Sequence, residues 1–298
     1  MQCRWHKHSM QLFRVTAKKG SHDQKGTVAL KGKSHQHITK HEQIQNTPKA
    51  KTQQQIQIFL LLLLCFGMVF GFCFFTKAQN LYEVSLTSCS QDQITILFTP
   101  EPTGLKDTLV FSFPATVPGT YDTQDYGRFV TSLMAYTEQH IPLKIKRKGP
   151  NRWFIYNAKQ LHHIRYEVED IMDKKIASHP IFQPAATAFI ENQLFLLNGG
   201  GVFGYLEGEE QKSILLRIQK PQELYGLSAL NQSQANDTLQ EFTAYNYHQL
   251  IDSPLMFSKP DTVQFFVNKT AVTLSVFDVQ GRRLAKTLFA ALQRDMKA

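Results

Sequence analysis

The chain has 298 residues and a formal net charge of +9. That excess lies in residues 1–55, where 11 Lys and Arg side chains face only Asp23 and Glu42, which leaves 22 basic and 22 acidic side chains in the rest of the chain. A folded region without net charge lacks the basic surface that DNA and RNA require. The composition therefore argues against a nucleic-acid binder, and no nucleic-acid partner is predicted.

Residues 1–55 are rich in Gln, Lys and His and poor in apolar side chains. Such a composition buries too little apolar surface to fold, so it predicts a disordered basic tail. An alternative is that the start has been assigned too far upstream and that the protein begins close to Lys49.

Residues 58–75 form an uncharged run of 18 residues, IFLLLLLCFGMVFGFCFF. A membrane-spanning helix needs about 20 such residues, whereas the small residues that follow suit signal-peptidase cleavage after Ala78 or Gln79. Residues 56–79 are therefore predicted to be either a transmembrane helix or a signal peptide. In both cases the preceding positive charge keeps the N-terminal side in the cytoplasm and the region from Asn80 is exported. It is then membrane-anchored through residues 58–75, or periplasmic or secreted.

From Asn80 onward, apolar residues alternate with polar ones along short runs, and turn residues such as Pro100 and Gly149 separate these runs. Alternation of this kind is typical of half-buried antiparallel strands. The runs are centred on Tyr82–Leu86, Ile94–Phe98, Leu109–Phe113, Ile141–Ile145, Trp153–Ile155, Tyr166–Val168, Val263–Val267 and Val272–Val276. The sequence predicts an all-β domain over residues 80–281, folded as an antiparallel β-sandwich.

A helical pattern appears only at the end of the chain. Leu284, Leu288 and Leu292 fall on one stripe of a helix, and charged residues lie off it. We therefore predict that the domain is preceded by one hydrophobic helix and followed by a short amphipathic helix within residues 282–298. This last helix either docks on its own domain or begins a further one.

A search for catalytic motifs gives mostly negative results. The chain has no His-Glu-x-x-His motif, nucleophile elbow or phosphate loop. His162 and His163 are adjacent in a strand-like run, so they are predicted to point to opposite faces and not to chelate together. The glycines at 199–201 are predicted to form a turn with positive φ. The sequence therefore predicts no catalytic residue, metal site or cofactor, and no enzyme activity for this chain.

Several strings nevertheless resemble the glycyl aminopeptidase family of zinc metallopeptidases. They are Pro114–Tyr121 with Asp125–Arg128, Phe195–Asn198, Gly204–Gly208, Lys220–Gly226 and Tyr247–Pro254. Members of that family usually have an N-terminal β-domain, a thermolysin-like catalytic domain and a PDZ domain. The resemblance spans about residues 80–280 and corresponds to the N-terminal β-domain only.

The resemblance implies a noncatalytic N-terminal domain of an exported metallopeptidase-like protein. The family's zinc ligands lie beyond this domain, and residues 282–298 resemble the lead-in to a catalytic domain that is absent here. The domain would flank a substrate cleft or pack on that catalytic domain, with Asn198, Gly199, Gly200, Gly201 and Asp252 as cleft-side candidates. A plain turn role for these residues is the competing interpretation. The alternatives for the whole chain are an independent exported β-sandwich that binds peptide or carbohydrate, and a fragment of an active aminopeptidase.

Overall fold

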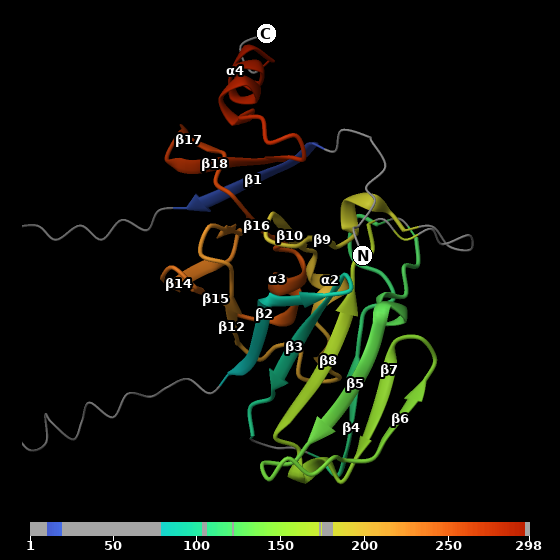
Figure 1. Cartoon of the computed structure of the whole chain (residues 1–298). Coiled ribbons are helices and arrows are strands. Elements are labelled where there is room, and N and C mark those ends of the chain that lie inside the picture. Colours follow the sequence, from blue (N-terminus) through green and yellow to red (C-terminus); the bar gives the residue numbers. More distant parts are fainter. Residues whose placement is uncertain are drawn as a thin grey trace, which may run out of the picture. The chain divides into compact units, whose positions relative to one another are not determined.

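The computed structural model describes residues 11–19, 79–102, 106–120, 122–172, 174 and 181–295. Strands dominate these residues and helices are short, which confirms the prediction of a mostly β chain (Figure 1). The hydrophobic run at 58–75 lies outside the described residues. Within the described part, no helix is long and apolar enough to cross a membrane.

The largest sheet has seven strands. In order across the sheet they are β14 (Asn231–Ala235), β15 (Leu239–Ala244), β12 (Ile214–Gln219), β2 (Asn80–Ser90), β3 (Gln93–Thr99), β8 (His163–Glu169) and β5 (Val130–Tyr136). All neighbours are antiparallel except β2 and β12, which are parallel. The prediction of a purely antiparallel fold is therefore wrong at this pair. A parallel pair needs a long connection, and the chain between β2 and β12 supplies it.

Two four-stranded sheets lie in the same unit. One contains β11 (Tyr205–Leu206), β4 (Thr108–Ser112), β7 (Arg152–Tyr156) and β6 (Ile145–Lys148). The other contains β13 (Tyr225–Leu227), β16 (Leu255–Ser258), β10 (Leu194–Leu197) and β9 (Ala188–Ile190). Every residue of β10 and β16 is buried, and their sequences are apolar without alternation, except that β16 ends in Ser258.

A three-stranded sheet consists of β1 (Gln11–Lys19), β18 (Thr270–Asp278) and β17 (Thr262–Val267). Residues 11–19 were predicted to be disordered, and their pairing with β18 corrects that prediction for this stretch. The edge of β18 offers unpaired backbone groups, and residues 11–19, which include the strand-forming Phe13, Val15 and Thr16, satisfy them. The other residues of the predicted tail lie outside the described part.

The helix α4 (Ala285–Asp295) lies within the range where the sequence predicts an amphipathic helix. It packs on β17 and β18 through a small apolar cluster of its own, in which the rings of Phe265 and Phe289 are 4.6 Å apart. This cluster is separate from the main core.

The main core is built by the alternation that the sequence predicts. In β2, Tyr82, Val84 and Leu86 are each no more than 2% exposed, and the residues between them are half-buried. Burying one such side chain contributes about 1.5–3 kcal/mol, so a sheet face of this kind supplies much of the stability of the domain. The core side of β3 continues the pattern with Ile94, Ile96 and Phe98.

Three buried tyrosines from separate elements bind one short segment, which consists of the last residue of α2 (Gly199–Val202) and the two residues after it. Their hydroxyls donate hydrogen bonds to three consecutive carbonyl oxygens: Tyr82 to Gly204 (2.6 Å), Tyr166 to Val202 (3.0 Å) and Tyr247 to Phe203 (2.7 Å). Tyr82 and Tyr166 lie on β2 and β8, and Tyr247 begins α3 (Tyr247–Ile251). Burial raises the pKa of all three phenols well above the ordinary value, so they remain protonated donors.

Replacing Tyr82 by Phe should lower the free energy of unfolding by about 1–2 kcal/mol, because the Gly204 carbonyl would be buried without a partner. The control is Tyr156→Phe, since the Tyr156 hydroxyl has no hydrogen bond among the described residues and its ring contact with Lys144 would persist. That change should stay within about 0.5 kcal/mol. Urea unfolding followed by circular dichroism measures both, and equal losses would contradict the role of the Tyr82 hydroxyl.

Candidate functional site

Segments that are far apart in the chain meet around a hollow of about 170 Å³. Its walls are formed by Val117–Thr120, Tyr126, Phe182, Pro184, Ala185, Asn198–Gly200, Ile251, Asp252 and Pro254. Four of the five predicted cleft-side residues, Asn198, Gly199, Gly200 and Asp252, are therefore brought together. Gly201 is not on the wall, because it is turned toward Ile171 and Thr187 in the interior.

The first wall is a tight loop between β4 and the 3₁₀ helix η1 (Tyr126–Phe129). The carbonyl oxygen of Ala115 accepts hydrogen bonds from the backbone N–H groups of Gln124 (2.7 Å) and Asp125 (2.9 Å), which closes the loop at its base. Gly119 has a φ of +87°, a conformation that glycine adopts without steric cost. These bonds hold the base of the loop, and its described residues Val117–Thr120 form one edge of the hollow.

Asn198 is fixed by hydrogen bonds inside the domain. Its side-chain amide donates to the carbonyl oxygens of Pro184 (3.3 Å) and Ala186. Pro184 lies in the 3₁₀ helix η3 (Gln183–Ala185), so Asn198 ties this part of the wall to the start of α2. The Asn198 amide thus positions the wall, and its donors are already used.

The glycines that begin α2 do not have positive φ, so the predicted turn is wrong. They are required by close packing. A Cβ atom on Gly199 would lie 2.6 Å from Cα of Ile251, and one on Gly200 would lie 2.7 Å from Cγ1 of Val117. The absence of side chains lets α2 approach both α3 and the loop at Val117.

Asp252 ends α3 and is exposed. Its backbone N–H donates to the carbonyl oxygen of His248 (3.1 Å), and the helix begins with an Asn246 side chain that accepts from the N–H of Gln249 (2.8 Å). Both ends of this short helix are therefore capped. Among the described residues that line the hollow, Asp252 alone carries a formal charge.

The hollow has a rigid, mostly apolar wall with one carboxylate. Tyr126 is its other titratable group, and burial raises the pKa of that phenol to about 12. Catalysis needs a convergent nucleophile, base and orienting group, whereas this wall offers contact surface. Sequence reasoning missed Phe182, Pro184 and Ala185, which stand in no motif. Phe182 is 39% exposed, so a large apolar side chain lies at the rim of the hollow.

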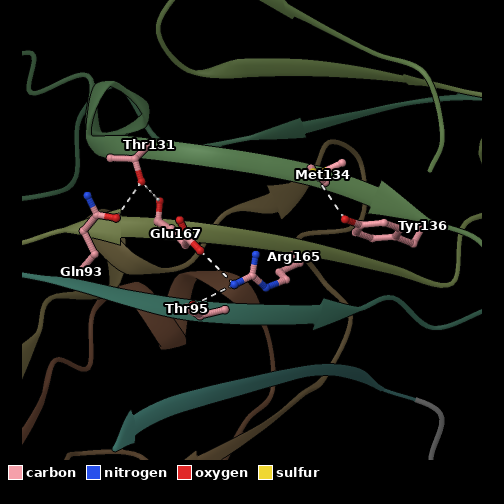
Figure 2. Close-up of polar contacts among 7 residues, drawn as sticks. All are labelled: Gln93, Thr95, Thr131, Met134, Tyr136, Arg165 and Glu167. Carbon is pink, nitrogen blue, oxygen red and sulfur yellow. Dashed lines mark hydrogen bonds and ion pairs between the residues drawn. The ribbon is translucent and has the colours of Figure 1, made fainter. Parts of the chain in front are cut away.

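A larger hollow of about 690 Å³ lies on the outer face of the seven-stranded sheet. Its charges are paired with one another. Arg217 bonds to Glu241 (2.8 Å) and Glu83 (3.0 Å), and Arg165 bonds to Glu167 (2.9 Å), as Figure 2 shows for the latter pair. These groups are partly exposed, so each pair contributes little to stability, and together they leave few unsatisfied groups for a ligand.

Three imidazoles gather at one end of this face. Nδ1 of His162 lies 3.0 Å from Nδ1 of His163, so the prediction that these rings point apart is wrong. The reason is that β8 begins at His163, and strand alternation does not extend back to His162. Tyr136, labelled in Figure 2, stacks on His163 at 5.1 Å, and His140 meets that ring edge-on at 5.5 Å.

No group of three or more His, Cys, Asp or Glu side chains in the described part of the chain is arranged to hold a metal ion.

The arrangement of sheets recurs in a solved structure. An aminopeptidase N family protein from Idiomarina loihiensis matches with a TM-score of 0.55 and 18% identity, over 63% of this chain and 31% of that chain. The fold is therefore that of a part of this larger protein. A leukotriene A4 hydrolase from Saccharomyces cerevisiae (13% identity, 63% and 29% covered) and an M1 zinc metallopeptidase from Deinococcus radiodurans (8%, 63% and 43%) have TM-scores of only 0.32 and 0.31.

The family of the chain follows from its sequence. The model of the Peptidase M61 N-terminal domain matches residues 81–259, and the chain belongs to this family. A comparison with curated proteins gives no match. The matched region spans less than a third of the Idiomarina protein, so the chain shares only one part of it.

Replacing Gly199 by Ala should lower the free energy of unfolding by about 2–3 kcal/mol, because the new methyl group would press on the backbone of α3. The matched control is Gly201→Ala, whose Cβ would come close only to side-chain atoms, Ile171 Cδ1 at 3.1 Å and Thr187 Cγ2 at 3.2 Å, with the Tyr126 ring at an ordinary contact distance of 3.4 Å. The control should lose less than about 1 kcal/mol, since these side-chain atoms can shift. Urea midpoints compare the two, and the reverse order would refute the packing argument.

The stability of the domain should fall as the pH drops below the ordinary His value of 6.5. Burial, with the neighbouring His162 and His140, lowers the pKa of His163, so folding favours the neutral ring. The stability that depends on this ring is present above pH 6.5 and is lost as the pH falls through the lowered pKa. His163→Phe should reduce the drop in melting temperature between neutral and acidic pH, whereas Tyr136→Phe, which keeps the imidazole, should not. An unchanged drop in His163→Phe would contradict this assignment.

Proposed function

We propose that this chain is the noncatalytic N-terminal domain of an exported zinc metallopeptidase of the glycyl aminopeptidase type. In this proposal, the hollow at Asn198 and Asp252 faces a catalytic domain and its substrate cleft. One observation carries the proposal: the strings at Pro114–Tyr121, Phe195–Asn198 and Tyr247–Pro254, which resemble that family, contribute walls to the same hollow.

The chemistry of the hollow suits contact with another protein surface. Its wall is mainly backbone and apolar side chain, Phe182 stands exposed at the rim, and Asp252 supplies one charge. Protein interfaces typically combine an apolar, aromatic centre with a polar margin. The internal hydrogen bonds of the wall keep it in one shape, which reduces the entropy lost on docking.

Hydrolysis would be supplied by the catalytic domain. A zinc hydrolase needs protein ligands for the metal, an open position for water and a general base. The hollow has one carboxylate and no imidazole, so its role would be to limit and orient what enters the cleft.

We also propose that residues 58–75 carry the domain across a membrane. The uncharged length of this run and the Lys and Arg excess before it support the proposal. N-terminal sequencing of the mature protein decides between cleavage after Ala78 or Gln79 and a retained anchor. An intact residue 1 on a cytoplasmic protein would refute both.

The main proposal predicts that the purified chain contains no stoichiometric zinc and does not hydrolyse glycine-leading peptides. Zinc content and aminopeptidase assays, with and without added zinc, measure this directly. Stoichiometric zinc with chelator-sensitive turnover would overturn the noncatalytic role.

The docking role is tested with the catalytic domain that the proposal expects in the DNA directly downstream. Adding this chain should raise the activity of that domain, and Phe182→Glu should abolish the gain. The matched control is Ile141→Glu, because Ile141 is also exposed, at 59%, and does not line the hollow. Absence of such a reading frame, or equal effects of the two variants, would argue against the proposal.

A further inference from the structure

The positive charge of the folded region is concentrated around one hairpin. Residues 139–166 contain no Asp or Glu and seven Lys or Arg side chains, in a region that is otherwise rich in acids. Five of these cations lie between 144 and 152, on β6, β7 and their flanks. Charge segregated in this way produces a local field that attracts anionic groups.

The cations on β6 are regularly spaced. Lys146 pairs with Phe154 and Lys148 with Arg152 on β7, so both lysines share one face of the sheet with Lys144. Alternate residues of a strand lie about 6.6–6.8 Å apart, and the three ammonium groups therefore form a row. All three lysines are exposed, and none forms an ion pair with a described residue.

The backbone of β6 is open along one side. β6 is the last strand of its sheet (Figure 1). The N–H of Tyr156 on β7 donates to the carbonyl oxygen of Lys144 (3.0 Å), and antiparallel alternation then directs the backbone groups of Ile145 and Arg147 away from β7. No described residue forms a backbone hydrogen bond with them on that side.

Arg147 holds this edge in place. Its guanidinium donates to the carbonyl oxygens of Gly127 (2.9 Å) and Pro150 (2.8 Å) and lies 4.6 Å from the centre of the Trp153 ring. The strand is therefore ordered before any partner arrives, which lowers the entropic cost of binding.

Lysines on an edge strand often serve only to prevent association. That explanation predicts charges on other edges of the same domain. Among the other edge strands of the described part, β5, β9, β11, β13, β14 and β17 carry no Lys, Arg, Asp or Glu. The remaining one, β1, carries Arg14, Lys18 and Lys19 among its nine residues. Six of these seven edges thus lack charge, so general protection of edges does not explain why three of the four residues of β6 are basic.

We propose that β6 binds an extended peptide segment with Asp or Glu at alternate positions, which adds to the sheet as a further strand. Backbone hydrogen bonds to Ile145 and Arg147 would supply affinity, and the lysine row would select acidic side chains of matching repeat. A lipid surface fits less well, because the hairpin tip, Gly149–Asn151, has no large apolar side chain to insert. The inference does not depend on the hollow or on a catalytic domain.

Fluorescence anisotropy tests the proposal on the full chain in a neutral detergent. The probe is a labelled peptide of about eight residues in which Thr and Glu alternate, compared with a peptide of the same composition whose Glu residues are contiguous. The alternating peptide should bind several-fold more tightly, and binding should weaken as salt is added. Equal affinity for both peptides would overturn the proposal.

Charge reversal tests the site. Lys146→Glu with Lys148→Glu should weaken binding at least about tenfold. The matched control, Lys31→Glu with Lys33→Glu, removes the same charge from the basic N-terminal region at the same spacing and should change binding less than twofold, about the scatter of the assay. Circular dichroism verifies folding, and Lys146→Gln with Lys148→Gln replaces the reversed variant if that variant does not fold. A larger loss in the control would overturn the assignment.

Backbone methylation separates strand addition from simple charge attraction. N-methyl groups on the Thr residues block antiparallel addition, and N-methyl groups on the Glu residues block parallel addition. Loss of binding by either methylated peptide supports the proposal, and full retention by both overturns it.

Vesicles of phosphatidylglycerol and a single-stranded oligonucleotide are the other two ligands tested, because both are anionic. The proposal would also be overturned if vesicles or the oligonucleotide bind the unaltered chain more tightly than the peptide does, and if charge reversal in β6 weakens that binding.

Discussion

Hydrogen bonds from three buried phenols to the carbonyls of Val202, Phe203 and Gly204 are the constraint on which the rest of the domain depends. A short irregular segment in a core leaves backbone acceptors without water, and each unpaired acceptor costs about 1–3 kcal/mol. The donors come from β2, β8 and α3, so the segment also ties these elements together. Gly204 adds a steric condition, because a Cβ atom there would lie 2.5 Å from the Phe111 ring.

The hollow follows from this anchoring. With the end of α2 fixed, its first residues are held against α3 and the loop at Val117, and only glycine fits there. Asn198 then secures the opposite wall through η3. The same internal bonds that make the wall rigid use up its polar groups, which is why it offers shape and apolar contact more than reactive chemistry.

Sequence patterns identify the half-buried strands well, because one solvent-facing side gives β2, β3, β7 and β8 a clear alternation. They fail for β10 and β16, which are buried on both sides and read as plain apolar runs. The run at Ile141 is only partly a strand, since β6 begins at Ile145. Local patterns do not encode the parallel pairing of β2 and β12, which depends on contacts distant in the chain.

The candidate site likewise contains residues that the sequence predicts and residues that only the folded structure brings together. Asn198 and Asp252 could be named as site candidates from the sequence, because they lie in strings whose residue types and spacing resemble a known family. Phe182 and Pro184 reach the same hollow only through folding, and no local pattern distinguishes them. For the glycines of α2, the sequence predicts correctly that glycine is required, but the predicted cause is wrong. Close packing and a positive φ both require glycine, and only the three-dimensional structure shows that close packing is the cause here.

The central position of β2 has a consequence for how the domain assembles. β2 pairs on one side with β3, its immediate successor, and on the other with β12, where Glu83 meets Arg217 across 134 residues of chain. Closing so long a loop lowers the entropy of the chain before any stabilising contact forms, and folds dominated by such contacts form slowly. The β2–β3 hairpin can form early, yet its far edge stays open until β12 is available. Throughout that interval the nascent domain exposes an unpaired central strand, so its folding is the stage at which it most needs protection from aggregation.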